Sequence, residues 1–325
     1  MHVLIIGAAG MIGRKLAERL ARDGAIAGCE IAKLTLVDIV QPAMPRSLAG
    51  RVSAYTADLT RMDAQALIAD HPDLIFHLAS IVSGEAEIDF EKGYLVNLDG
   101  TRRLFEAIRL EGPSYRPRLV FTSSIAVYGA PLPPRIPDDY INAPLTSYGT
   151  QKAICELLLA DYSRRGFFDG IGLRLPTICI RPGAPNRAAS GFFSNILREP
   201  LAGKEAVLPV SEDVRHWFAS PRAAVSFLLH AASLDLERVG PRRSLNMPGL
   251  SATVADEIAA LRRFGGEAAA KLIRHEADPG IERIISSWPR DFDARRAQEL
   301  GFVADASFDD IVRAHLEDEM DDPGR

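Results

Sequence analysis

The first 24 residues constrain the fold of this chain more than any other segment. The apolar run HVLII (2–6) predicts a buried strand, and the charged, amphipathic stretch 11–24 predicts a helix. At their junction lie three glycines: Gly7, Gly10 and Gly13. Glycines at this spacing permit a sharp turn, a close approach of the backbone to a pyrophosphate, and close packing of helix on strand. Because the first N–H groups of a helix are free to bind phosphate oxygens, the sequence predicts a dinucleotide site that includes Met11 and Ile12.

Apolar runs and helical patterns alternate through the first half of the chain. Further strands are predicted at 33–38, 51–58, 72–79, 118–124 and 171–180, and helical patterns at 85–111 and 148–166. This alternation indicates right-handed βαβ units and a parallel sheet with helices on both faces. We therefore expect an α/β fold in which residues 1–175 form a Rossmann-type doubly wound parallel sheet that binds NAD.

The second half of the chain has a less regular pattern. Helices are predicted at 192–201, 220–234 and 254–266, the last with Thr253 as its N-cap and Gly265 as its C-cap. We expect residues 176–325 to form mainly a smaller substrate domain, with segments at about 215–250 returning to the large sheet.

Composition excludes several classes of function. The net charge of −5 provides no basic surface for nucleic acid or for an anionic membrane. No apolar run approaches the roughly 18–20 residues that span a bilayer. The three cysteines are widely spaced and lack a C-x-x-C motif, as is typical of free thiols in the cytoplasm. No pair of the seven histidines has metal-ligand spacing, so we expect a cytoplasmic protein without a metal.

Acidic and small residues that follow the predicted strands suit the cofactor. Asp38 ends the second strand, where its carboxylate can accept hydrogen bonds from ribose hydroxyls and would repel a 2′-phosphate. This favours NAD over NADP. Asp58 and Leu59 follow the third strand and suit an adenine contact, although Asp58 is equally suited to capping its own loop. The cofactor ribose is expected to lie against the end of the fourth strand, at Leu78, Ala79 and Ser80.

The stretch SYGTQKA (147–153) supplies candidate catalytic groups. Tyr148 and Lys152 are four residues apart, so they lie on the same face of a helix. An ammonium within about 4 Å of the phenol oxygen would lower the tyrosine pKa by about three units, enough for a general base near neutrality. Ser124 ends the fifth strand, and its hydroxyl can hold the reacting oxygen in line with Tyr148. The Y-x-x-x-K motif is short and occurs by chance, so its weight depends on the dinucleotide site that precedes it.

Taken in order, GAAGMIG, Asp38, FTSSIAVYG (121–129) and YGTQK (148–152) resemble the extended short-chain dehydrogenase/reductase family. The resemblance implies NAD as cofactor. It also implies a catalytic set of Ser124, Tyr148 and Lys152, with the last two also contacting the cofactor.

The same resemblance assigns roles beyond the catalytic set. It makes Asn97 the helix asparagine that supports the active site, and it makes the segment of Pro176, Thr177 and Ile178 the one that passes the nicotinamide. It further implies a homodimer formed through the helices at about 85–111 and 148–166.

Members of this family include nucleotide-sugar epimerases and dehydratases as well as dehydrogenases. Here Ser220, Pro221 and Arg222 replace a V-D-D type element, and PTICIRPG replaces an Asn-x-Tyr-Gly-Pro element, so the nucleotide-sugar pattern is broken. The segments VSGEAE (82–87) and LNMPGLSATV (245–254) resemble instead members that oxidise a four-carbon sugar acid at C2 with NAD. A nucleotide-sugar isomerase or lyase with tightly held NAD and a non-catalytic dinucleotide sensor remain alternatives.

A small acid requires a group that holds its carboxylate, and the planar fork of arginine suits this task. The candidates are Arg181, Arg187 and Arg215, each of which can instead be a structural or solvated arginine. Ser83 and Gly84 can offer a hydroxyl and a backbone N–H after the fourth strand. Trp217 is a candidate for the pocket wall, although an aromatic residue in an apolar segment more often belongs to the core.

Overall fold

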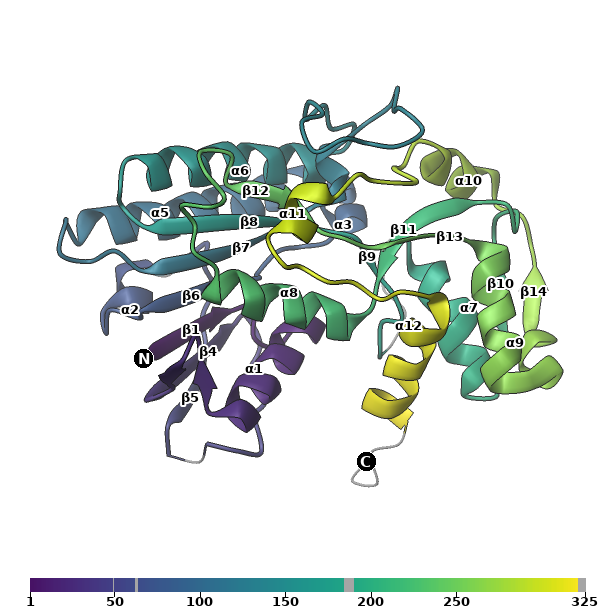
Figure 1. The fold of residues 1–325 in the computed structure, drawn as a ribbon, viewed down its shortest axis with the longest axis horizontal. Coiled ribbons are helices and arrows are strands. Elements are labelled where there is room, and N and C mark those ends of the chain that lie inside the picture. Colours follow the sequence, from purple (N-terminus) through teal and green to yellow (C-terminus); the bar gives the residue numbers. More distant parts are fainter. Residues whose placement is uncertain (49, 62–63, 184–189, 321–325) are drawn as a thin grey trace.

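The computed structural model describes residues 1–48, 50–61, 64–183 and 190–320. In these residues a seven-stranded sheet has the order β12-β8-β7-β6-β1-β4-β5, and every neighbouring pair is parallel (Figure 1). Its strands are β1 (His2–Ile6), β4 (Lys33–Asp38), β5 (Val52–Thr56), β6 (Leu74–His77), β7 (Arg118–Ser124), β8 (Asp169–Leu175) and β12 (Ser244–Asn246). The chain order reverses next to β1, so the predicted Rossmann-type parallel sheet is confirmed.

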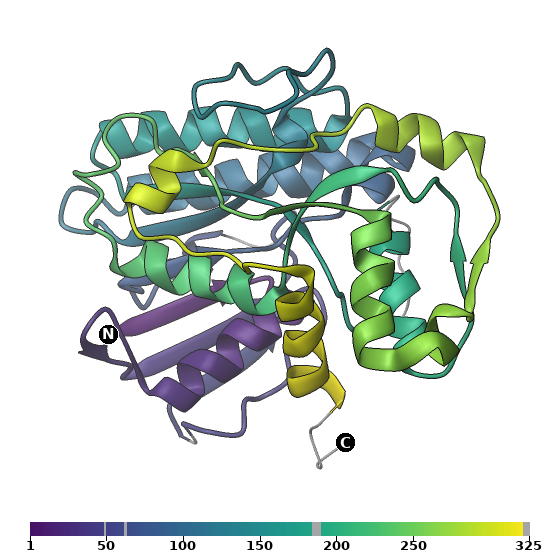
Figure 2. The same ribbon diagram turned by 45° about the vertical axis from the view of Figure 1, so that its right-hand side comes forward.

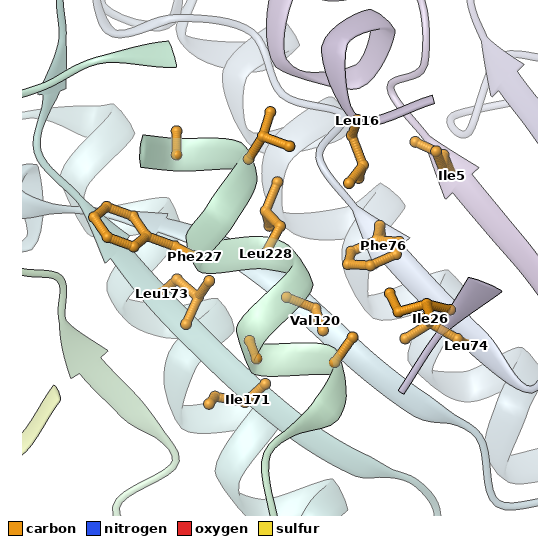
Figure 3. Packing of buried hydrophobic residues seen from close by; sticks show 14 of the residues in the cluster. Ile5, Leu16, Ile26, Leu74, Phe76, Val120, Ile171, Leu173, Phe227 and Leu228 are labelled. Atoms are coloured by element: carbon orange, nitrogen blue, oxygen red, sulfur yellow. The ribbon is translucent and has the colours of Figure 1, made fainter. Parts of the chain in front are cut away.

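Helices cover both faces of this sheet. One face carries α1 (Met11–Asp23) and α8 (Pro221–Ser233), and the other carries α2 (Ala64–Ile68), α5 (Thr101–Leu110) and α6 (Ser147–Arg164). Side chains of β1 alternate between the two cores, because Ile5 packs on the first and Leu4 on the second. Figure 3 shows the first core, where Leu16 of α1 and Leu228 of α8 lie over the strands. Burial of each such side chain contributes about 1.5–3 kcal/mol.

A smaller lobe lies beside the carboxyl edge of the large sheet (Figure 2). It contains a three-stranded sheet, β13-β11-β9, and a two-stranded sheet, β10-β14. Its elements are β9 (Thr177–Ile178), α7 (Gly191–Leu201), β10 (Ala206–Leu208), β11 (Arg215–Ala219), β13 (Leu250–Thr253), α9 (Val254–Ala270), β14 (Ile273–His275), α10 (Pro279–Ser286) and α12 (Phe308–His315). The chain crosses between the lobes more than once, since α8 and β12 belong to the large sheet.

Three predicted elements differ from the observed ones. The strand predicted at 171–180 leaves the large sheet at Pro176, which has no N–H for the ladder, and β9 pairs with β11 of the smaller lobe. The helix predicted at 85–111 is divided into α3 (Ser83–Ile88), α4 (Phe90–Gly93), a π-helical turn (Tyr94–Gly100) and α5. Thr253 caps α9 as predicted, but Gly265 does not end it, because the break comes at Gly266, where φ is 71°.

Shorter elements complete the described chain. They are β2 (Ala25–Ile26), β3 (Cys29–Glu30), a 3₁₀ turn (Ile125–Val127), α11 (Arg295–Glu299) and a C-terminal π-helical segment (Leu316–Met320). No helix in the described ranges is long and apolar enough to cross a membrane.

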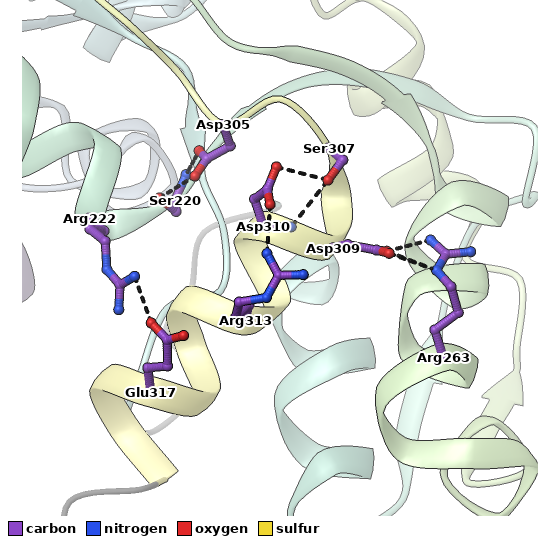
Figure 4. A network of polar contacts seen from close by, with 9 residues as sticks. All are labelled: Ser220, Arg222, Arg263, Asp305, Ser307, Asp309, Asp310, Arg313 and Glu317. Carbon is purple, nitrogen blue, oxygen red and sulfur yellow. Dashed lines mark hydrogen bonds and ion pairs between the residues drawn. The ribbon is translucent and has the colours of Figure 1, made fainter.

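The C-terminal segment ties the two lobes together (Figure 4). Asp305 accepts hydrogen bonds from the backbone N–H and the hydroxyl of Ser220, at 2.7 and 2.8 Å, where α8 begins. Asp309, on α12, accepts from the guanidinium of Arg263, on α9, at 2.5–3.0 Å. Because α8 lies on the large sheet and α9 in the smaller lobe, these contacts fix the smaller lobe relative to the carboxyl edge.

Glu257 is a buried carboxyl group that weakens the smaller lobe. It lies on α9 with no exposed surface, and neither oxygen has a hydrogen-bond partner among the described residues. Burial, together with the neighbouring Asp256, raises the pKa of Glu257 well above its usual 4.5. The unfolded chain releases this proton above about pH 4.3 whereas the folded chain retains it, so the group lowers stability as pH rises.

We expect Glu257→Leu to raise the free energy of unfolding by about 1–3 kcal/mol near neutral pH. The gain should become smaller as the pH falls towards 4, where the carboxyl is protonated in both states. Urea unfolding at several pH values measures this. Glu257→Gln is the matched control, since it keeps the shape and cannot ionise. A change in stability that is the same at every pH would contradict the argument.

Candidate active site

The glycine loop between β1 and α1 has the shape of a phosphate cradle. Gly7 has φ of 93°, and a Cβ there would lie 2.5 Å from the backbone nitrogen of Ala79. A Cβ on Gly13 would lie 2.1 Å from the Gly7 carbonyl oxygen. At Gly10, by contrast, the nearest atom would be 3.4 Å away. Packing therefore requires the first and third glycines, whereas a Cβ at the second would make an ordinary contact.

The first turn of α1 is suited to bind an anion. Its N-cap, Gly10, makes no side-chain capping bond, and no acidic residue lies in the first turn. Met11 and Ile12 are partly exposed there, so their N–H groups and the positive end of the helix dipole are available. Asp38 lies beside them, because its Oδ2 accepts the Ala9 N–H at 2.9 Å. These residues fit a dinucleotide with its pyrophosphate at the glycines and a ribose near Asp38.

The predicted adenine contact has competing local roles. Oδ1 of Asp58 accepts from the N–H and the hydroxyl of Thr60, at 2.9 and 2.7 Å, and these bonds lower the pKa of Asp58. This is the capping role that the sequence also allowed. Leu59 is buried in the core between the sheet and α5. Contact of either residue with adenine stays a prediction.

The carboxyl ends of β6 and β7 meet the start of α6 at Tyr148. The hydroxyls of Ser124 and Ser80 act on this phenol and lower its pKa. Gly149 permits this approach, because a Cβ there would lie 2.1 Å from the Ala126 carbonyl oxygen. The geometry thus brings together the predicted Tyr148 and Ser124, and it adds Ser80, which had been assigned to the cofactor alone.

Asn97 supports this cluster from the π-helical turn. Its Oδ1 accepts from the Ser80 hydroxyl and from the Ile81 N–H, both at 2.9 Å. Its Nδ2 donates to Oε1 of Gln151 at 2.8 Å. Asn97 therefore connects the end of β6 to α6. Gln151 was missed by the sequence reasoning, although its place inside YGTQK was a signal.

Lys152 donates a hydrogen bond to a backbone carbonyl at the end of β7. Its Nζ donates to the carbonyl oxygen of Thr122 at 2.8 Å and lies 5.7 Å from the centre of the Tyr148 ring. Burial lowers the pKa of Lys152 to about 8. A contact of Lys152 that lowers the tyrosine pKa stays a prediction.

The charge that acts on Tyr148 comes from Arg181. Burial raises the pKa of Tyr148, and hydrogen bonds from Ser124 and Ser80 and the positive charge of Arg181 offset part of that rise. The Nε of Arg181 donates to the Ile178 carbonyl at 3.0 Å, and its Nη2 donates to Ser190 at 2.9 Å. Among the described residues it has no carboxylate partner. Arg181 is thus a held, largely buried cation beside the phenol.

The other predicted substrate residues lie in different settings. Arg215 is exposed and donates to the Ser251 carbonyl at 3.0 Å; it lies at the opposite end of β11 from Ala219, which pairs with Ile178. Trp217 is buried against Phe292, as a core residue would be. Ser83 is partly exposed at the start of α3, and Arg187 lies outside the described residues.

The segment predicted to pass the nicotinamide joins the two lobes. Pro176 and Ile178 are buried, and Thr177 between them is partly exposed. Leu78 and Ala79 directly follow β6, and both donate their N–H groups to the Ile6 carbonyl. No group of side chains in the described ranges could hold a metal ion.

Comparison with known proteins agrees with this architecture. Residues 3–233 match the NAD dependent epimerase/dehydratase family. The D-erythronate dehydrogenase of Cupriavidus necator is 49% identical, over 98% of both chains. That of Haemophilus influenzae is 43% identical, over 98% of this chain and 100% of its own.

Solved structures share the fold. The crystal structure of the nucleoside-diphosphate-sugar epimerase from Agrobacterium tumefaciens is 63% identical, with a TM-score of 0.96 over 98% of this chain and 94% of its own. The GalE-like L-threonine dehydrogenase from Cupriavidus necator is 21% identical, with a TM-score of 0.81 over 98% and 99%, and shares the fold alone. This chain belongs to the NAD dependent epimerase/dehydratase family.

Proposed function

We propose that this protein is an NAD-dependent dehydrogenase that oxidises D-erythronate at C2 to 2-dehydro-D-erythronate. The observation that carries the proposal is the Tyr148 phenol, whose pKa is lowered by the hydroxyls of Ser124 and Ser80 and by the charge of Arg181. Two full-length relatives at 43–49% identity are D-erythronate dehydrogenases. The substrate would be an acid with a reacting hydroxyl. Tyr148 could remove the hydroxyl proton, and Arg181 could bind the carboxylate.

We assign the following roles to the residues of the chain. The glycine loop and Asp38 hold the dinucleotide, with Asp38 selecting NAD over NADP. NAD, when bound, supplies the acceptor for the hydride from C2. Tyr148 removes the proton of the C2 hydroxyl, and Ser124 holds the same oxygen in line. Lys152 fixes the end of β7 and supplies a nearby positive charge.

A nucleotide-sugar epimerase is the second candidate, because the relative at 63% identity is described as one. The chain's own residues argue against it. Where nucleotide-sugar members usually carry a V-D-D type element, this chain places Ser220, which caps α8 and donates to Asp305. That serine supports the fold and has no free group to offer a nucleotide.

Net formation of NADH from D-erythronate tests the proposal. In a panel of three- to six-carbon aldonic and 2-hydroxy acids, we expect D-erythronate to give the highest kcat/KM, with NADP at least about tenfold poorer than NAD. Tyr148→Phe should lower kcat by about 10²–10⁴-fold while NAD still binds. Epimerised nucleotide sugar without net NADH would contradict the proposal, as would unchanged turnover by Tyr148→Phe.

We assign the substrate carboxylate to Arg181. Arg181→Met should raise KM for the acid by about 10–100-fold, because a charge-assisted pair is lost, and should leave NAD affinity unchanged. The pKa seen in the pH profile of kcat/KM should also rise, since the positive charge of Arg181 lowers the pKa of Tyr148. Arg215→Met is the matched control and should change neither value. If Arg181→Met and Arg215→Met changed KM for the acid equally, the assignment of the carboxylate to Arg181 would be wrong.

We also propose that two copies of the chain associate through α3, α4 and α6 and the π-helical turn. Large apolar side chains are exposed on these elements: Ile88 at 72%, Phe90 at 58%, Leu95 at 40% and Leu157 at 72%. Exposed apolar groups of this size commonly mark an interface. Light scattering should give twice the chain mass, and Leu157→Glu should give the mass of one chain; a monomeric wild type would contradict this.

A further inference from the structure

Thr177 and His216 form a polar pair at the junction of the two lobes that the proposed chemistry has not used. Thr177 is on β9 and His216 on β11, two strands that pair in parallel. The Thr177 Oγ1 and the His216 Nε2 are 2.6 Å apart. Thr177 is partly exposed, whereas His216 is buried with 1% of its surface exposed. The histidine therefore lies on the buried side of the threonine and is hydrogen-bonded to its hydroxyl.

Aromatic side chains fix the orientation of the imidazole. Phe193 stacks on the His216 ring, with centroids 5.2 Å apart and planes 2° from parallel. The Phe218 ring meets the imidazole edge-on, with centroids 5.3 Å apart. The Trp288 ring is tilted relative to the imidazole, with centroids 5.4 Å apart. Contacts on three sides leave the ring no freedom to rotate, so Nε2 points steadily at the Thr177 hydroxyl.

The same setting fixes the proton positions. Burial lowers the pKa of His216 to about 3, and the charge of Arg181 adds to this, so the ring is neutral at physiological pH. Nδ1 makes no hydrogen bond of standard geometry with a described residue, but the Pro289 carbonyl acts on the ring as an acceptor. We assign the hydrogen of the neutral ring to Nδ1, which leaves Nε2 as the acceptor. The Thr177 hydroxyl then donates inwards, and its oxygen keeps lone pairs for an outside donor.

Position connects this pair to the reaction. Thr177 lies between Pro176 and Ile178, the residues assigned to the nicotinamide side. The charge of Arg181 acts on both the Tyr148 phenol and the His216 ring. Leu175, two residues before Thr177, pairs with Ser124, and Arg181 donates to the carbonyl oxygen of Ile178, the residue after Thr177. Thr177 therefore lies at the carboxyl edge, close in the chain to residues that pair with Ser124 and bind Arg181.

We propose that Thr177 recognises a hydroxyl of the substrate beyond the reacting carbon, and that His216 is a positioning residue that holds Thr177 as an acceptor. The inference rests on the proposed function and deepens it, because it makes the site selective for polyhydroxylated acids over simple 2-hydroxy acids. A hydroxyl on the substrate can donate to the Thr177 oxygen; an acid that lacks it would leave that oxygen unpaired.

Binding to the NADH-loaded enzyme tests this without turnover. Calorimetry should show D-erythronate binding at least about tenfold more tightly than 2-hydroxybutanoate of the same C2 configuration. Thr177→Val should weaken D-erythronate binding by about tenfold, leave 2-hydroxybutanoate binding within about twofold, and so remove the selectivity. Thr177→Ser, which keeps the hydroxyl, should retain most of it. Equal weakening of both acids, or unchanged selectivity in Thr177→Val, would overturn the inference.

Paired variants of His216 test the positioning role. His216→Phe keeps the ring stack and removes Nε2, so it should raise KM for D-erythronate by about fivefold or more with little change in kcat. His216→Gln places an acceptor near the Nε2 position and should restore the wild-type KM in large part. His216→Phe combined with Thr177→Val should be no worse than Thr177→Val alone. The positioning role would be overturned if the effects of the two substitutions on KM were additive. It would also be overturned if His216→Gln had a KM no lower than that of His216→Phe.

The two proposals fail separately. If the wild type forms no NADH from D-erythronate, the proposed function is wrong. If it forms NADH and Thr177→Val retains wild-type selectivity in binding, the function stands and the role of Thr177 is wrong.

Discussion

The proposed general base, Tyr148, must lie at a fixed place, and here two hydroxyls act on its phenol. Ser80 lies three residues after β6, Ser124 ends β7, and both act on the pKa of Tyr148 at the start of α6. The site exists only where all three elements meet. Gly149 and the glycines of the cofactor loop serve this meeting by permitting backbone contacts that a Cβ would prevent.

A buried ion pair holds α6 in this position. The Arg174 guanidinium, on β8, donates to both oxygens of Glu156 on α6 at 2.7–3.1 Å. Ser123, the neighbour of Ser124, also donates to Glu156. Breaking one partner of such a pair leaves an uncompensated buried charge, which is strongly destabilising. The helix that carries Tyr148 and Lys152 is thus anchored to β7 and β8 from behind.

Local sequence patterns were sufficient for the sheet and for the cofactor cradle. The bounds of β1, β4 and β7 follow their apolar runs, and the glycine loop follows from residue type and spacing. Contacts across the lobes could not be predicted in this way. The direction of Lys152 depends on the Thr122 carbonyl, and the pairing of Thr177 with His216 depends on β9 leaving the sheet at Pro176. Such features depend on tertiary packing, which the hydrophobic periodicity of the sequence does not report.

We propose that burial raises the pKa of Tyr148 and keeps the phenol protonated until further positive charge is added beside it. A difference absorbance titration of tyrosinate, wild type minus Tyr148→Phe, measures the pKa of this phenol directly. In the free enzyme we predict ionisation above the usual value of about 10, and with NAD, whose oxidised ring is cationic, a downward shift of more than about one unit. NADH, with a neutral ring, should give no comparable shift. A phenol that titrates at its usual value and responds equally to both nucleotides would contradict the account.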